Sequence, residues 1–166
     1  MIDFIRSERG SSIIGWVIIV PTLFFFAAFG FVYFYSNQAR ACVAMAAREG
    51  AREYGIQLGQ VGATTAEIKA KNRALKVMVQ EKMFSQDKAK FSSTPPPAGE
   101  RGASATFSDS GTWAKCTITY YLPNPLPTAP RLLWKKDDGD EGGWWPVHFK
   151  VVVTGAAKHE YKQENP

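Results

Sequence analysis

The strongest pattern in the chain is an unbroken apolar run, Ile13–Tyr35, whose 23 residues include no Lys, Arg, Asp or Glu. At about 1.5 Å per residue, a helix of this length reaches about 34 Å, enough to cross a bilayer core of about 30 Å. Trp16 lies near one end and Tyr33 and Tyr35 lie at the other, as is typical of aromatic residues at membrane interfaces. A cleaved secretory signal is the alternative, but its apolar part is shorter. We therefore expect a transmembrane helix over residues 11–36.

The sequence predicts that this helix continues, because nothing from Ser36 to Gly55 breaks it. Small residues recur there at spacings of three and four, which gives the helix one face of low volume. Such a face lets another backbone come close, so we expect it to pack against a partner helix or against copies of itself. The predicted packing and assembly residues are Gly15, Pro21, Ala39, Val43, Ala46, Ala47 and Gly50.

Three glycines, Gly55, Gly59 and Gly62, predict the end of this long helix. Thr64 followed by Glu67 three residues later has the spacing of a capping box, which predicts the start of a second helix. This second helix extends to about Phe84 and is expected to bury an apolar stripe. The residues of the stripe are Ile68, Leu75, Val77, Met78, Val79 and Met83.

Past a Pro-rich linker at 92–99, the period of the hydrophobic pattern changes to two, which is typical of strands. The expected strands are Ala103–Phe107 and Thr112–Leu122, joined by the hairpin signal Asp109-Ser110-Gly111, and a last strand from Val147 to about Lys162. The fold class is therefore α+β: a long N-terminal helix, a second helix and a small antiparallel sheet packed against the long helix. The predicted divisions are 1–10, a cytoplasmic leader or tail; 11–36, the transmembrane helix; 37–91, extracytoplasmic helices; and 92–166, a small β domain with Pro-rich loops.

Composition and charge exclude several classes of function. The net charge is +5, and the excess lies between Gln38 and Phe91, on predicted helix without interleaved aromatics, which favours a solvated face over nucleic-acid binding. The chain has two cysteines and two histidines, His148 and His159, and no nucleophile–base pair or metal-binding motif is visible. The acidic cluster at 137–141 lacks the spacing of a calcium loop. We expect a protein that is not an enzyme and that carries no cofactor or metal.

The two cysteines, Cys42 and Cys116, are a candidate disulfide. Cys42 lies on the small-residue face of the long helix, and Cys116 lies in the middle of the longest strand. A single pair of cysteines suits an oxidising compartment, and the bond would close a loop of about 75 residues and add about 4 kcal/mol. The alternative is two buried free thiols, since unpaired cysteine is commonly buried.

Several short motifs resemble those of a known family. Arg9-Gly10 matches a short basic leader that ends in glycine, Pro21 stands eleven residues after that glycine, and the stretch Ala46-Ala47-Arg48-Glu49-Gly50-Ala51-Arg52 lies just beyond the apolar run. In these features the chain resembles the TadE-like proteins, pilin-like subunits of tight-adherence (Tad) pili. The segment 151–157 resembles their last strand more loosely. The resemblance implies a candidate processing site between Gly10 and Ser11.

One residue departs from the family pattern. Pilin-like proteins usually carry a glutamate five residues after the processing glycine, where this chain has Gly15. In such proteins this acid is thought to pair with the new N-terminal amine of a neighbouring subunit, and its loss is a feature of tip subunits. The departure leaves two alternatives: a tip subunit that is processed after Gly10, or an anchor that keeps residues 1–10.

The resemblance implies a single-pass protein of the bacterial inner membrane that serves as a minor pilin-like or pseudopilin-like subunit of a Tad-type pilus or secretion machine. Its partners would be membrane lipid and other pilin-like or inner-membrane assembly subunits within a multi-subunit complex. A short polar tail before the span and one large domain after it favour a cytoplasmic N-terminus. The alternative is an unprocessed accessory subunit or binding module of another envelope complex, which would grip its partner with the Pro-rich loop and Trp144-Trp145.

Overall fold

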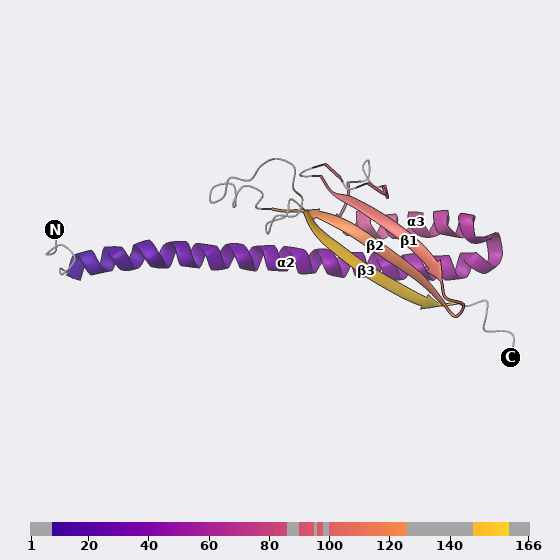
Figure 1. The fold of residues 1–166 in the computed structure, drawn as a ribbon, viewed down its shortest axis with the longest axis horizontal. Helices are drawn as coiled ribbons and strands as arrows, with labels where there is room; N and C mark the ends of the chain where they lie inside the picture. Colours follow the sequence, from indigo (N-terminus) through magenta and orange to yellow (C-terminus); the bar gives the residue numbers. More distant parts are fainter. Residues whose placement is uncertain (1–7, 86–89, 95, 98–99, 126–147, 160–166) are drawn as a thin grey trace. The chain divides into compact units, whose positions relative to one another are not determined.

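The computed structural model describes residues 8–85, 90–94, 96–97, 100–125 and 148–159, with side chains from residue 15 onward. This part of the chain forms two helices, α2 (Glu8–Val61) and α3 (Ala63–Gln80), and three strands, β1 (Gly102–Asp109), β2 (Trp113–Pro123) and β3 (His148–Lys158) (Figure 1). The predicted α+β class is confirmed. Contacts divide the chain into two units, Met1–Tyr35 and Ser36–Pro166.

Helix α2 is a single helix of 54 residues that includes both the predicted span and the sequence after it. Pro21 lies inside it, and neither Gly55 nor Gly59 ends it, contrary to our expectation. The helix ends before Gly62, whose φ of 83° lies in the left-handed region that glycine adopts without strain. Only the last of the three glycines therefore acts as the helix terminator that the sequence predicted.

The sheet of the second unit has the order β1-β2-β3, with antiparallel pairing between neighbours. The predicted hairpin joins β1 to β2. In this turn Gly111 has a φ of 80°, and its N–H donates to Asp109 Oδ1 at 2.7 Å. The last strand, predicted from Val147 to about Lys162, runs from His148 to Lys158; residues 147 and 160–162 lie outside the described part.

The strands of the sheet have one buried face and one exposed face, as the period-two pattern of β2 requires. The even-numbered side chains of β2 are buried and its odd-numbered side chains are exposed or half-buried. The buried set comprises Ala114, Cys116, Ile118, Tyr120 and Leu122. This face lies against the helices of the second unit and supplies most of its largest buried side chains.

Close packing of the sheet on α2 depends on glycines. A Cβ added to Gly155 of β3 would lie 2.4 Å from the backbone carbon of Ala47. A Cβ added to Gly50 would lie 3.1 Å from Cys116 Sγ and 3.3 Å from the Cβ of Ala74 in α3. The second half of α2 is therefore covered on one side by the sheet and by α3, which lies beside it in Figure 1.

Helix α3 differs from the prediction in its start and in its buried face. It begins at Ala63 after Gly62, and no side-chain hydrogen bond caps it, so the Thr64–Glu67 capping box does not form. Its buried residues are Ala66, Ala70, Ala74 and Met78, whereas Ile68 is exposed. The predicted burial of Met78 and Met83 is confirmed. The three alanines are buried for a steric reason, because α3 approaches the small-residue face of α2 closely at Ala74 and small side chains fit between the two backbones there.

The C-terminus of α3 is capped by hydrogen bonds within residues 78–83 and by side chains of Arg101 and of Tyr120 in β2. Met83 N–H donates to Met78 O at 2.9 Å and Lys82 N–H donates to Val79 O at 3.0 Å, the two bonds of a Schellman motif. Arg101 Nη1 donates to the carbonyl oxygens of Lys82 and Met83 at 2.8 and 2.9 Å. The buried Tyr120 hydroxyl also donates to Met83 O at 3.1 Å. These bonds fix the end of α3 to the sheet.

Candidate functional site

The first unit exposes an apolar surface that is unusual for a protein in water. Its large side chains from Trp16 to Phe34 are about half to three-quarters exposed, with Phe24 and Phe34 at 75%. No side chain of the most apolar 18-residue window of α2 is buried, and its mean hydropathy is 2.3. Among the described residues, α2 is the one helix long and apolar enough to cross a membrane.

The residues of the first unit that the sequence singled out all lie on helix α2. Gly10 and Ser11 lie within the first turns of α2, so the candidate processing site is helical in the structure. A Cβ at Gly15 would have no neighbour within 4 Å. Just after Pro21, Thr22 Oγ1 donates to Ile18 O, one turn earlier, at 2.7 Å.

The predicted small-residue face of α2 does pack closely, but against this chain's own elements. Val43, Ala46 and Ala47 are fully buried and Ala39 is 3% exposed. The sheet and α3 fill this face, as the contacts of Gly155 and Gly50 show. A partner helix therefore cannot pack on this face, because β3 and α3 of the same chain already pack closely against its small residues.

Polar pairs border the contact between α2 and α3. Arg73 Nη2 lies 3.0 Å from Glu49 Oε2, and Lys69 Nζ donates to Gln57 Oε1 at 2.8 Å. Both pairs are exposed, so each adds at most about 1 kcal/mol and mainly fixes the register of the helices. The sequence did not single out these pairs, because nothing in it shows which residues of α2 and α3 face each other.

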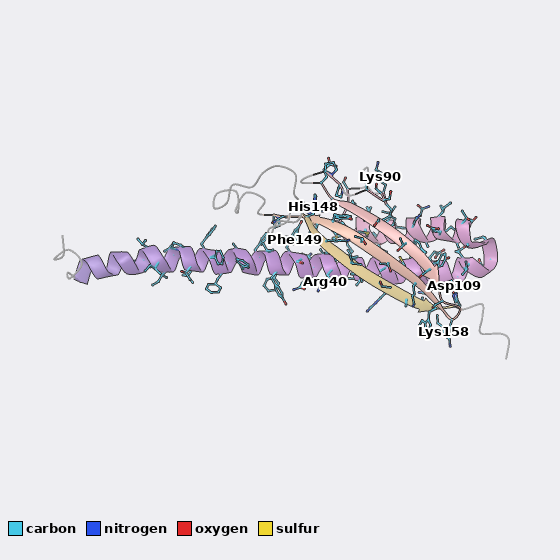
Figure 2. All side chains as sticks on the ribbon, viewed as in Figure 1. Arg40, Lys90, Asp109, His148, Phe149 and Lys158 are labelled. Atoms are coloured by element: carbon cyan, nitrogen blue, oxygen red, sulfur yellow. The ribbon has the colours of Figure 1, made fainter. Side chains whose placement is uncertain are left out.

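Arg40, Arg48 and Arg52 have exposed side chains on the second half of α2, and Figure 2 labels the first of them. Within the described part of the chain, none of the three guanidinium groups forms an ion pair or a hydrogen bond. This agrees with the predicted solvated basic face.

The predicted disulfide is not formed, and both cysteines are buried free thiols. Cys116 Sγ lies over Gly50, which is eight residues beyond Cys42 on the same helix and therefore about 12 Å away along its axis. Bonded cysteines need Cα atoms within about 7 Å. Burial raises the pKa of the Cys116 thiol to about 12. Burial and the nearby carboxylate of Glu81, 4.0 Å from the sulfur, raise the pKa of Cys42.

A buried histidine joins the end of β3 to the β1–β2 hairpin. His159 Nε2 lies 2.7 Å from Asp109 Oδ1, its side chain is completely buried, and its backbone N–H donates to Thr112 O at 3.2 Å. A Cβ on Gly55 would be 3.7 Å from His159 Nδ1, so the ring also lies against α2. The sequence predicted only that His159 belongs to the sheet, because the two residues are fifty positions apart.

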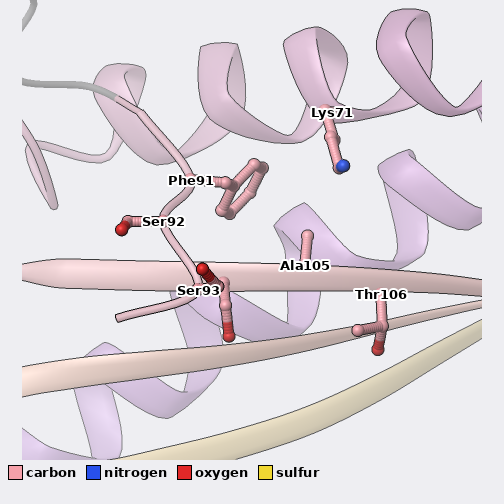
Figure 3. A pocket seen from close by; sticks show the side chains of 7 residues that line it. Lys71, Phe91, Ser92, Ser93, Ala105 and Thr106 are labelled. Atoms are coloured by element: carbon pink, nitrogen blue, oxygen red, sulfur yellow. The ribbon is translucent and has the colours of Figure 1, made fainter. Parts of the chain in front are cut away.

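An open groove of about 340 Å³ follows the outer edge of β1 (Figure 3). Ser104, Ala105 and Thr106 line it from β1, and Lys71 lines it from α3. The third side consists of residues 91–93, and Phe91 forms a short parallel bridge with Ala103. The sequence did not predict this groove, because its walls come from three separate segments of the chain.

Other candidate features lie outside the described residues. These are the acidic cluster at 137–141, most of the Pro-rich loop and Trp144-Trp145. Within the described ranges, no three His, Cys, Asp or Glu side chains are grouped so that they could hold a metal ion.

Comparisons with models of known protein families, with curated proteins and with solved structures find no match to this chain.

Proposed function

We propose that this chain is a single-pass membrane protein that acts as a minor pilin-like or pseudopilin-like subunit of a Tad-type pilus or secretion machine, without enzymatic activity. The observation that carries the proposal is the division of α2. Its first half exposes large apolar and aromatic side chains, and its second half is the packing centre of a folded unit. A helix of this kind suits a protein that is anchored in lipid and presents a folded domain outside it.

The resemblance to TadE-like proteins supplies the particular role. It rests on Arg9-Gly10, on the position of Pro21 and on the stretch Ala46–Arg52, which here follows the exposed apolar part of α2. In this proposal the N-terminus is cytoplasmic, the second unit lies outside the bacterial inner membrane, and the chain works within a multi-subunit complex. Gly15, in place of the usual glutamate, favours a subunit at the tip of a fibre.

The second candidate is an unprocessed membrane-anchored accessory subunit. It is favoured by the continuous helix from Glu8 through Gly10 and Ser11, since a peptidase must open a helix before it can cut there. The same lipid anchor and folded unit serve both candidates, which differ only in whether residues 1–10 are removed and in whether the chain enters a fibre.

Two measurements test the proposal. Deleting the gene should abolish or shorten surface fibres, and expression of the wild-type chain should restore them; unchanged fibres after deletion would contradict a role in pilus assembly. The intact mass of membrane-extracted protein then separates the candidates. A chain that starts at Ser11 supports the processed subunit, and a chain that starts at Met1 supports the accessory subunit. Replacing Gly10 with a bulky residue, with Gly15→Ala as the matched control, should block any cut without altering the folded unit.

A further inference from the structure

The outer edge of β1 offers unused backbone hydrogen-bonding groups. Ala103 O accepts from Ser92 N–H at 2.8 Å, so the backbone of Ala103 faces away from β2. Because residues of an antiparallel strand alternate in this respect, the N–H and C=O groups of Ala105 and Phe107 face the same outer edge. Within the described part of the chain, neither residue forms a backbone hydrogen bond on that side.

The chain itself occupies only the beginning of this edge. Residues 91 and 92 follow β1 at Ala103, and the chain then turns away, because Thr94 N–H donates to Ser92 Oγ and the two hydroxyls lie 2.9 Å apart. The groove along Ser104–Thr106 opens where the chain departs. The groove thus leaves space for a second strand beside Ser104–Thr106, on an edge that already accepts one short parallel bridge at Ala103.

The two outer strands of the sheet differ in charge. β1 has no charged side chain from Gly102 to Ser108, whereas β3 carries Lys150 and Lys158, which are exposed. Lysines on an edge strand oppose pairing with another copy, because like charges would be brought together. The strand β1 itself lacks this protection, and Lys71 of α3, which lines the groove beside it, is paired with Glu67 Oε1 at 2.7 Å. An uncharged strand edge with alternating donors and acceptors is complementary to itself.

A row of threonines on the exposed face gives the register of such pairing. Thr106, Thr117 and Thr154 are direct neighbours across β1, β2 and β3, and the hydroxyls of Thr117 and Thr154 lie 2.9 Å apart. The row ends at Thr106, on the open edge. A second antiparallel β1 centred on Thr106 would continue the row, since threonine pairs across strands are favourable.

We propose that the edge of β1 binds a second copy of this chain, with two β1 strands pairing antiparallel about a two-fold axis at Thr106. Ala105 of each copy then exchanges backbone hydrogen bonds with Phe107 of the other, and the two Thr106 residues form a non-hydrogen-bonded pair with Cα atoms about 4.5 Å apart. Residues 91–93 limit the contact to this short segment. The proposal goes beyond the proposed function and does not depend on it, because the contact can form in any membrane that concentrates the chain.

Oxidative cross-linking of the full-length protein in membranes and in detergent tests the proposal. Thr106→Cys should give a disulfide-linked dimer, because the paired Cα atoms lie within the roughly 7 Å that the bond requires. Thr154→Cys, in the same row but on β3, should give none, and neither should the wild type, whose two cysteines are buried. Cross-linking of Thr154→Cys in preference to Thr106→Cys, or of neither, would overturn the proposal, as would capture of a different protein by Thr106→Cys.

A second variant tests the backbone contact. Ala105→Pro removes an N–H that faces the open edge and leaves the ladder to β2 intact, so proline is tolerated there as it is on other edge strands. Combined with Thr106→Cys, it should abolish the cross-link while the circular dichroism of the protein stays unchanged. A cross-link that survives Ala105→Pro would place the association elsewhere, such as in the membrane helix. Either result is independent of fibre formation, so failure of this proposal is distinguishable from failure of the proposed function.

Discussion

The two halves of α2 are built for different surroundings although they form one helix. From Gly15 to Tyr35 the helix displays bulky side chains, such as Phe24 at 75% exposure. A Cβ added to Gly15 or Gly30 would have no neighbour within 4 Å. From Ser36 onward the same helix carries small residues on one face, and these are buried by a sheet and a second helix. Large apolar side chains on an unpacked helix require an apolar solvent, whereas small ones require a close protein neighbour. The apolar surfaces of the two halves therefore differ in side-chain size, large in the first half and small in the second.

The covered half should be the more sensitive to added volume. Gly155→Val should lower the free energy of unfolding of the second unit by about 3 kcal/mol or more, because the new Cβ would meet the rigid backbone of Ala47 and Arg48 within 2.6 Å. Urea unfolding of the full chain in detergent, followed by circular dichroism, measures the change. Ala156→Val is the matched control, since Ala156 is exposed on the other face of β3 and should tolerate the substitution. Equal stability of the two variants would contradict the packing of β3 on α2.

The exposed half should instead be sensitive to charge. Phe24→Arg, near the middle of the apolar run, should disfavour membrane insertion by about 3 kcal/mol, because a charged side chain at the centre of a bilayer is poorly solvated. The fraction of protein that remains in the membrane pellet after alkaline extraction measures the effect. Met45→Arg provides the comparison in the second half, where Met45 is exposed and the arginine can remain in water. If Phe24→Arg stayed in the pellet like the wild type, the apolar half would not be the membrane anchor.

The covered half should also respond to alkaline pH. Burial holds the pKa of Cys116 at about 12 in the folded chain, above the ordinary thiol pKa of 9.0 that is expected after unfolding. Between these values the folded state keeps a proton that the unfolded state releases, so stability is complete below about pH 9 and falls as the pH rises toward 12. The expected slope is about 1.4 kcal/mol per pH unit. Urea titrations at pH 8 and pH 10 measure it.

Cys116→Ala is the control for this pH dependence. Lysine and tyrosine side chains also titrate at alkaline pH, but their contributions are common to the wild type and the variant. The variant should lose the part of the slope that belongs to the thiol, although its stability at pH 8 should be lower because a buried side chain has been shortened. Identical slopes in the two proteins would show that Cys116 is already accessible to water in the folded state.

Local patterns predicted most of the fold. The apolar run, the period-two strands and the Asp109–Gly111 turn are encoded by neighbouring residues, and the structure confirms the helix and the strands that they predict. The errors concern residues whose role depends on distant parts of the chain. Gly55 looks like a helix terminator, but it remains helical and leaves room for Ala114 and His159. No local signal distinguishes a glycine that ends a helix from one that admits a neighbour.

Dependence on distant residues also explains why the sequence did not predict which face of α3 is buried or that the edge of β1 is open. Ile68 was expected to be buried on hydrophobicity alone, yet Ala66, Ala70 and Ala74 are buried instead. The spacing of these alanines by four residues is a signal that could have been used, because it matches the small-residue face of α2. The open edge of β1 could not have been predicted, since it depends on where residues 91–94 leave the strand.

The smallest expected effect concerns the helix that covers the second half of α2. Lys82 follows α3 with a φ of 57°, in the left-handed region that side chains other than glycine adopt at a cost of roughly 1–2 kcal/mol. Lys82→Gly should relieve this strain without removing the hydrogen bonds of the Schellman motif, which use only backbone groups at this position. Glycine also loses more entropy on folding, so the net gain should be about 0.5–1 kcal/mol. Lys82→Ala, which removes the charge but keeps the Cβ, should give no comparable gain in urea unfolding; equal stabilisation by both variants would attribute the effect to charge rather than to the backbone conformation that ends α3.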